Sequence, residues 1–103
     1  MQLVENKIYG LLGLCTRAGK ISFGTEAVLE KIAKHKIKLV IIAEDISEKS
    51  KQKIVDVCQK EKVQYYIFGT IFDNSKAIGK VNKAIIGIED KNFADAIKNK
   101  LST

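Results

Sequence analysis

The stretch Ile37–Asp45 constrains the fold most, because a continuous apolar run within it stops abruptly at two carboxylates. Residues 39–43 are Leu-Val-Ile-Ile-Ala, and they lack the alternation of apolar and polar positions that is typical of a strand with one solvent-exposed face. Such a run is typical of a strand covered on both faces, and we expect a central, mostly parallel strand over Leu39–Ala43. In open α/β sheets, ligands bind beyond the carboxyl ends of such strands, which makes Glu44 and Asp45 the first candidate site residues.

Helical and extended patterns alternate on both sides of this strand. Apolar spacing predicts helices over Met1–Arg17, Glu26–His35 and Ile71–Gly79. Two further helices are expected, one from a cap at Asp45 or Ser47 to about Lys62 and one after a cap at Asp90. The remaining strands are expected over Lys20–Phe23, Val63–Phe68 and Ala84–Ile88. This order predicts a three-layer α/β/α sandwich, with the Val63–Phe68 strand parallel to the central strand and beside it. At 103 residues, we expect one domain over residues 1–103.

Glycine, threonine and cysteine positions add local detail. Gly19 suits a left-handed end to the first helix, and Thr25 suits the N-cap of the second. Cys15 and Cys58 lie on apolar faces, share no C-x-x-C motif and have no histidine at ligand spacing. We therefore expect both cysteines to pack in the core, without a metal site or a disulfide framework.

Net charge and absent motifs narrow the function classes. The net charge of +6 and the pI near 9.3 favour an acidic partner, most commonly nucleic acid. No run of about 18 apolar residues predicts a membrane span, and the start of the chain has no basic-then-apolar signal pattern, so we expect a cytoplasmic protein. The chain has no phosphate loop, no dinucleotide fingerprint and a single histidine. We therefore expect no catalytic residues, no metal, no cofactor and no small-molecule substrate.

Two polar segments next to predicted elements are candidate binding residues. The turn Gly24-Thr25-Glu26 precedes a helix, where free backbone N–H groups attract phosphates or contact bases, and its acidic side chain favours a base-edge contact. An ordinary capped helix start is the alternative, and it is the commoner case for such a turn taken alone. Glu44 and Asp45 fit three interpretations: an acid–base pair, acceptors for base amino groups, or a helix cap at Asp45 beside a solvated Glu44. The last interpretation is favoured over the acid–base pair, because consecutive residues at a strand end point in different directions.

A third polar segment, Lys80–Lys83, precedes the last predicted strand. Lysines there would supply salt-dependent affinity for a nucleic-acid backbone. The amide of Asn82 would be able to read an exposed base edge. An ordinary solvated loop is an alternative of about equal weight for this segment.

Four motifs follow one another along the chain: Arg17-Ala-Gly-Lys20, Phe23-Gly-Thr-Glu26, Lys38-Leu-Val-Ile-Ile-Ala-Glu-Asp45 and Ala77-Ile-Gly-Lys80. Together they resemble the ribosomal L-seven-Ae / L-thirty-e family of RNA-binding proteins, which includes kink-turn binders. The resemblance covers nearly the whole chain and is closest to the small bacterial YlxQ-like branch, which the later Asn92-Phe93-Ala94 also resembles. It implies an α/β/α sandwich with a four-stranded mixed sheet.

The resemblance also implies a non-catalytic protein that is ribosome-associated or binds structured RNA. Its RNA surface would comprise the glycine turn, the end of the central strand and the loop before the last strand, namely Gly24, Thr25, Glu26, Glu44, Asp45, Ile46, Lys80, Val81, Asn82 and Lys83, with Lys20 and Lys34 as further backbone contacts. Kink-turn binders carry an Asn-Glu pair after the glycine and a lysine further along, where this chain has Glu26, Ala27 and Glu30. An alternative is a module that docks on a ribosomal or transcription protein, which this acidic turn favours.

Overall fold

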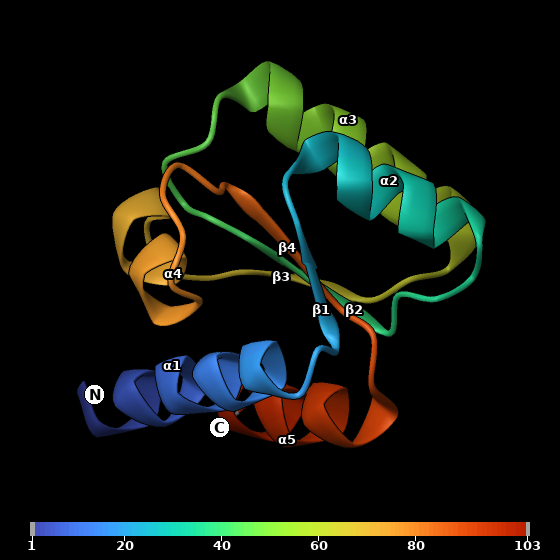
Figure 1. Ribbon diagram of the computed structural model, residues 1–103. Helices are drawn as coiled ribbons and strands as arrows, with labels where there is room; N and C mark the ends of the chain where they lie inside the picture. The colour runs from blue at the N-terminus through green and yellow to red at the C-terminus, as the bar shows by residue number, and fades with distance from the viewer. Residues whose placement is uncertain (1, 103) are drawn as a thin grey trace.

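The computed structural model describes residues 2–102, which form helices and strands in strict alternation (Figure 1). The elements are α1 Gln2–Arg17, β1 Ile21–Phe23, α2 Thr25–Ala33, β2 Leu39–Ile42, α3 Glu48–Glu61, β3 Tyr65–Ile67, α4 Ile71–Ala77, β4 Ile85–Ile88 and α5 Lys91–Leu101. Helices α1 and α5 cover one face of the sheet, and α2 and α3 cover the other (Figure 1). The predicted three-layer α/β/α sandwich is therefore confirmed. The predicted helix start at Met1 lies outside the described residues.

The sheet is mixed, with the strand order β1-β4-β2-β3. Strand β2 pairs with β3 in parallel, with Val40 opposite Tyr65, as the sequence predicts. Its other neighbour, β4, is antiparallel, with Leu39 opposite Ile88, and β4 is also antiparallel to β1. The expectation of a mostly parallel central strand is therefore wrong on one side. A continuous apolar run reports burial of both faces, and it carries no information on the direction of the neighbouring strand.

The two faces of β2 divide the core into two halves. Leu39 and Ile41 point to the half under α1 and α5, and Val40 and Ile42 point to the half under α2 and α3. All four side chains are fully buried, which explains the continuous apolar run. Cys15 belongs to one half and Cys58 to the other, both as buried free thiols. Burial raises the pKa of each thiol to about 11.

The helix caps only partly follow the sequence expectations. Gly19 adopts the expected left-handed conformation, with φ of 69°, and the Asp90 carboxylate accepts from the Phe93 backbone N–H at the start of α5. Ser47, one of the two candidates, caps α3 by accepting from the Ser50 N–H at 3.2 Å. Thr25 does not cap α2, because it is already the first helical residue. Gly24 takes the N-cap position, where no side-chain oxygen accepts.

Candidate nucleic-acid interface

The direction of β4 brings the three predicted segments to one edge of the sheet. Because β4 is antiparallel to both β1 and β2, its first residue lies beside the last residues of those two strands. The Gly24 N–H donates to the Ile85 carbonyl at 2.9 Å, and the Ala43 N–H donates to the Ala84 carbonyl at 2.9 Å. The glycine turn, the carboxylates and the loop before β4 therefore meet there. We call residues 24–26, 44–46 and 80–83 the loop edge.

The end of β3 and the start of α4 also lie at this edge, although the sequence did not predict them there. The Glu44 N–H donates to the Gly69 carbonyl at 2.7 Å, and the Asp45 carboxylate accepts from the Ile71 N–H at 2.8 Å. Asp45 therefore holds α4 to the end of β2, and the interpretation of Asp45 as the cap of α3 is wrong. Glu44 is exposed to solvent, as expected. Since β3 is parallel to β2, its carboxyl end had to reach this edge.

Phe23 holds two lysines of the loop edge in place. The Lys80 and Lys83 ammonium groups lie 5.1 and 5.5 Å from the centre of its ring. A cation over an aromatic ring is worth about 0.5–1 kcal/mol at an exposed site. The Lys83 backbone is also anchored, because its N–H donates to the buried Ser75 hydroxyl at 2.8 Å. Both positive charges are therefore positioned beside the glycine turn.

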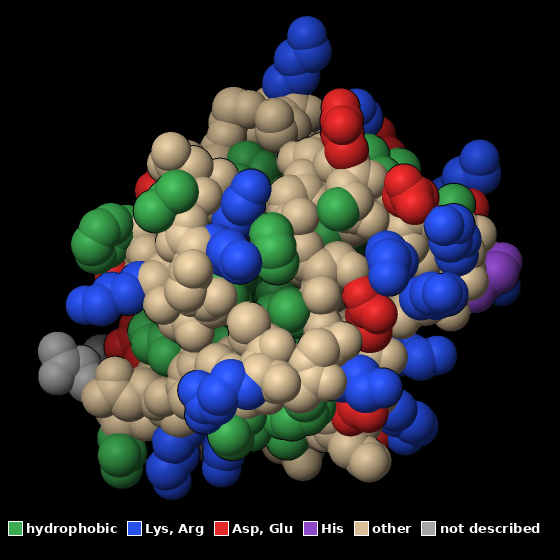
Figure 2. Space-filling model, viewed as in Figure 1, with side chains coloured by type: hydrophobic (Ala, Val, Ile, Leu, Met, Phe, Trp, Pro, Cys, Tyr) green, Lys and Arg blue, Asp and Glu red, His purple; other side chains and the backbone are tan. Residues whose placement is uncertain are grey.

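A cleft of about 760 Å³ lies between α4 and the loop before β4. Its rim carries two large apolar side chains, Phe72 and Val81, with exposed fractions of 72% and 77%. Apolar and lysine side chains lie together over this part of the molecule (Figure 2). The cleft is lined by Asp45, Ile71, Phe72, Ser75, Lys76, Gly79, Lys80, Val81 and Asn82. Phe72 was not among the predicted site residues, because the sequence of a short helix gives no signal that a single aromatic side chain is exposed.

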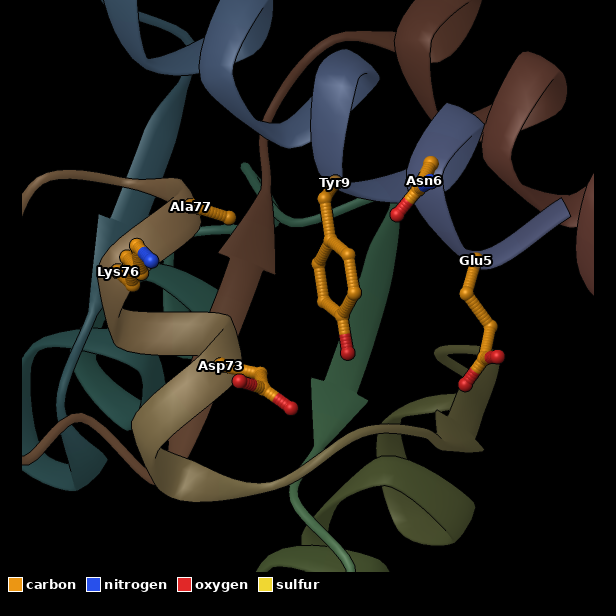
Figure 3. Close-up of a pocket in the computed structure, with 6 residues that line it drawn as sticks. All are labelled: Glu5, Asn6, Tyr9, Asp73, Lys76 and Ala77. Atoms are coloured by element: carbon orange, nitrogen blue, oxygen red, sulfur yellow. The ribbon is translucent and has the colours of Figure 1, made fainter. Parts of the chain in front are cut away.

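A second cleft, of about 640 Å³, separates α1 from α4 (Figure 3). Figure 3 shows the Tyr9 ring between the two helices, with its hydroxyl end toward the side of the cleft where Asp73 lies. The pKa of Tyr9 is raised, mainly by burial and to a lesser extent by the negative charges of Asp73 and Glu5. The phenol therefore stays protonated at neutral pH and is a poor nucleophile. None of the predicted site residues lines this cleft.

Lys20 and Lys34 lie away from the loop edge. The Lys20 carbonyl accepts from the Glu89 N–H at 2.9 Å, just beyond the end of β4, which is the opposite end of the sheet. Lys34 follows the last residue of α2, and its ammonium group lies 3.1 Å from the Glu30 carboxylate. The structure thus gathers the other predicted residues and leaves these two at the far end.

The loop edge is not positively charged as a whole. Its exposed carboxylates are Glu26, Glu44 and Asp45, against the ammonium groups of Lys80 and Lys83. Within residues 2–102, no three His, Cys, Asp or Glu side chains gather in a way that could hold a metal ion. No helix in the same range is long and apolar enough to cross a membrane. The excess positive charge of the chain therefore lies elsewhere on the surface.

Comparison with known sequences gives a family and several relatives. Residues 6–90 match the profile of the ribosomal protein L7Ae/L30e/S12e/Gadd45 family. The protein from Bacillus subtilis named RNA-binding protein YlxQ is 32% identical over 89 residues, which cover 86% of this chain and 89% of the relative. The protein of the same name from Enterococcus faecium is 35% identical over 94 residues, which cover 91% and 90%. Large ribosomal subunit protein eL8 of Thermoplasma volcanium is 31% identical over 88 residues, covering 84% and 73%.

Solved structures share the fold. A Bacillus halodurans protein of unknown function superposes with a TM-score of 0.91 at 28% identity, covering 94% of this chain and 98% of that one. The Giardia lamblia 15.5kD RNA binding protein superposes with a TM-score of 0.79 at 17% identity, covering 96% and 85%. At that identity, the second likeness concerns the fold alone.

Proposed function

Because this chain belongs to the ribosomal protein L7Ae/L30e/S12e/Gadd45 family, we propose that it is a non-catalytic RNA-binding protein of the cytoplasm that acts on structured RNA, alone or on the ribosome. Two relatives that match most of the chain are named RNA-binding proteins, and another is a ribosomal protein. The observation that carries the proposal is the meeting of three loop segments around the first residues of β4. RNA would bind at this loop edge.

The glycine turn would contact the RNA through backbone and side chain. The first N–H groups of an α-helix have no partner within the helix, and at α2 no side-chain oxygen caps them. These groups would donate to phosphate or base oxygens. The exposed Glu26 and Glu44 carboxylates only accept hydrogen bonds, so they would select base amino and imino groups and repel phosphates.

The lysines and the apolar rim would complete the contact. Lys80 and Lys83, held beside Phe23, would neutralise phosphates that approach the glycine turn. Asn82 and the rim formed by Phe72 and Val81 suit an unpaired base that leaves its helix. Structured RNA with loops or bulges offers such bases, whereas a regular duplex does not. The proposed ligand is therefore folded RNA with unpaired nucleotides.

Filter binding of ribosomal RNA fragments tests this function. We expect affinity to fall with salt, and the double variant Lys80→Ala/Lys83→Ala to weaken binding and to reduce the log–log salt slope by about 1.5, at about 0.7–0.9 for each lost phosphate contact. Lys53→Ala/Lys60→Ala removes the same charge from exposed positions of α3 and is the matched control. Equal effects of the two double variants would remove the loop edge as the site.

A protein-docking role at the same edge is the second candidate function. The three carboxylates of the edge and the exposed Phe72 and Val81 favour it, because a phosphate-binding surface needs neither feature. The partner would be a ribosomal or transcription protein. Affinity capture from lysate with and without nuclease separates the two functions: a partner protein retained after nuclease, and lost in Phe72→Ala, would favour docking over RNA binding.

A further inference from the structure

We propose that the far end of the sheet carries a second RNA contact surface, which takes RNA phosphates in addition to those bound at the loop edge. The surface consists of Lys20, Lys31, Lys34, Lys36 and Lys38, and we call it the lysine face. This inference rests on the proposed RNA-binding function. It assigns a role to two lysines, Lys20 and Lys34, that the sequence places in the RNA site and the fold places outside the loop edge.

Two backbone hydrogen bonds and one ion pair bring Lys20, Lys38 and Lys31 around the end of β4. The Lys20 carbonyl accepts from the Glu89 N–H at 2.9 Å, and the Lys38 N–H donates to the Ile88 carbonyl at 2.7 Å. Lys20 and Lys38 therefore flank the last residue of β4 on its two sides. The Lys31 ammonium group reaches the same place from α2, 3.5 Å from the Glu89 carboxylate. Residues from three separate segments thus share one surface.

The end of α2 adds Lys34 and Lys36 to this surface. His35 takes a left-handed conformation, with φ of 59°, and the Lys36 N–H donates back to the Lys31 carbonyl at 3.0 Å. This tight reversal keeps Lys34 and Lys36 within one turn of Lys31 and directs the chain into Lys38. Figure 2 shows lysine or arginine side chains gathered on the right of the view, where α2 ends in Figure 1.

The charge balance of the lysine face differs from that of the loop edge. Two of its five ammonium groups form ion pairs: that of Lys31 with the Glu89 carboxylate and that of Lys34 with the Glu30 carboxylate. The Glu89 side chain is only 17% exposed, and its carboxylate accepts a hydrogen bond from the Ser22 hydroxyl, so little of this negative charge faces the solvent. Among the described residues, no ion pair joins Lys20, Lys36 or Lys38 to a carboxylate. The lysine face is therefore a positively charged surface.

RNA phosphate fits this surface better than an anionic membrane does. A surface that inserts into lipid carries exposed large apolar side chains among its lysines. The large apolar side chains that the described residues expose are Leu3, Leu14, Ile67, Phe72 and Val81, and none of them lies between residues 17 and 38. The longest dimension of the molecule is 32 Å, so one folded RNA is large enough to touch the loop edge and the lysine face together.

The test uses the triple variant Lys20→Gln/Lys36→Gln/Lys38→Gln and the control Lys49→Gln/Lys53→Gln/Lys60→Gln, which removes equal charge from exposed positions of α3. The probes are ribosomal RNA fragments, an RNA duplex of about 20 base pairs and phosphatidylserine vesicles. We expect the first variant to weaken binding of both RNA probes roughly tenfold and to reduce the log–log salt slope by about 2. We expect the control to change both quantities much less, and circular dichroism to show both variants folded.

Three results would overturn the lysine face, and each is separate from failure of the proposed function. The first is an equal loss of RNA affinity in the triple variant and in its control. The second is RNA binding that only the Lys80→Ala/Lys83→Ala variant weakens. The third is vesicle binding that depends on the three lysines while RNA binding does not. By contrast, a wild-type protein that binds neither RNA probe refutes the proposed function itself.

Discussion

Replacing Gly69 by alanine is expected to destabilise the protein much more than the same change at Gly79. The two glycines have nearly identical positive φ angles, of 69° and 71°. A Cβ atom at Gly79 would meet no atom within 4 Å, whereas a Cβ at Gly69 would overlap the Asn74 side-chain oxygen and come within 3.0 Å of the Tyr9 hydroxyl. The pair therefore separates steric cost from backbone strain.

The magnitudes follow from these contacts. A left-handed conformation costs alanine about 1–2 kcal/mol, and this cost is common to both positions. At Gly69 the fully buried Asn74 must also move, although its amide donates to the Phe68 carbonyl at 2.8 Å. Leaving such a buried group without a partner costs a further 1–3 kcal/mol, roughly. We expect losses of about 1–2 kcal/mol for Gly79→Ala and about 2–5 kcal/mol for Gly69→Ala.

Urea unfolding followed by far-ultraviolet circular dichroism measures both losses. The dependence of the free energy of unfolding on urea should stay the same in the two variants, so that the midpoint shift reports stability alone. Equal midpoints for Gly69→Ala and Gly79→Ala would refute the reasoning, since they would show that Asn74 accommodates the extra methyl group without cost. A Gly69→Ala change that costs less in an Asn74→Ala background than in the wild type would locate the clash at Asn74.

Other predictions concern the core, one cap and the thiols. Ile41→Ala, at a fully buried position of β2, is expected to lose about 2–5 kcal/mol in a chemical denaturation series. Ser47→Ala removes the acceptor of the Ser50 N–H and is expected to lower the stability by about 1 kcal/mol, measured from the melting temperature. Ser47→Asp, which keeps an N-cap acceptor, is expected to retain most of that stability. Cys15 and Cys58 are expected to react with a thiol reagent at pH 8 only after unfolding, because both have a pKa near 11 when folded. Since these values lie above the unfolded value of 9.0, their contribution to stability is complete below pH 9 and declines as the pH rises toward 11, which denaturation at pH 8 and pH 10 measures.

The apolar pattern was sufficient to predict the layers but not the pairing of the strands. Leu39 to Ile42 are buried from both sides, and their sequence already required helices on both faces. The sequence of β4, Ile-Ile-Gly-Ile, is equally apolar whichever way the strand runs. Its place between β1 and β2 depends on contacts between distant segments, so the antiparallel pairing was not readable from local spacing.

The role of Asp45 shows the same limit at the scale of one side chain. Both Asp45 and Ser47 are suitable N-cap residues, and they stand two positions apart. Ser47 takes the cap because Asp45 is engaged by the Ile71 N–H, a residue 26 positions away. Such a partner becomes visible only when β2 and β3 are placed side by side.

The strand pattern pointed to Glu44 and Asp45, and the family resemblance implied that the other two loop segments join them, whereas the basic residue type alone did not locate a residue. The glycine turn, the carboxylates and the loop before β4 were expected to converge, and backbone hydrogen bonds bring them together. Lys20 and Lys34 were assigned to the RNA site because they are basic, yet their elements carry them to the far end of the sheet. Phe72 was missed because exposure of a single aromatic on a short helix cannot be read from its sequence.

The most direct test of the RNA site is a nuclear magnetic resonance titration of the labelled protein with a ribosomal RNA fragment. Binding at the loop edge predicts backbone amide shifts concentrated at residues 24–26, 44–46, 69–72 and 80–83, with lysine-face shifts at residues 31–38. Residues on the exposed sides of α1 and α5 should change little, since these helices cover the face of the sheet away from α2 (Figure 1). Shifts confined to α1 and α5, with an unchanged loop edge, would contradict the account.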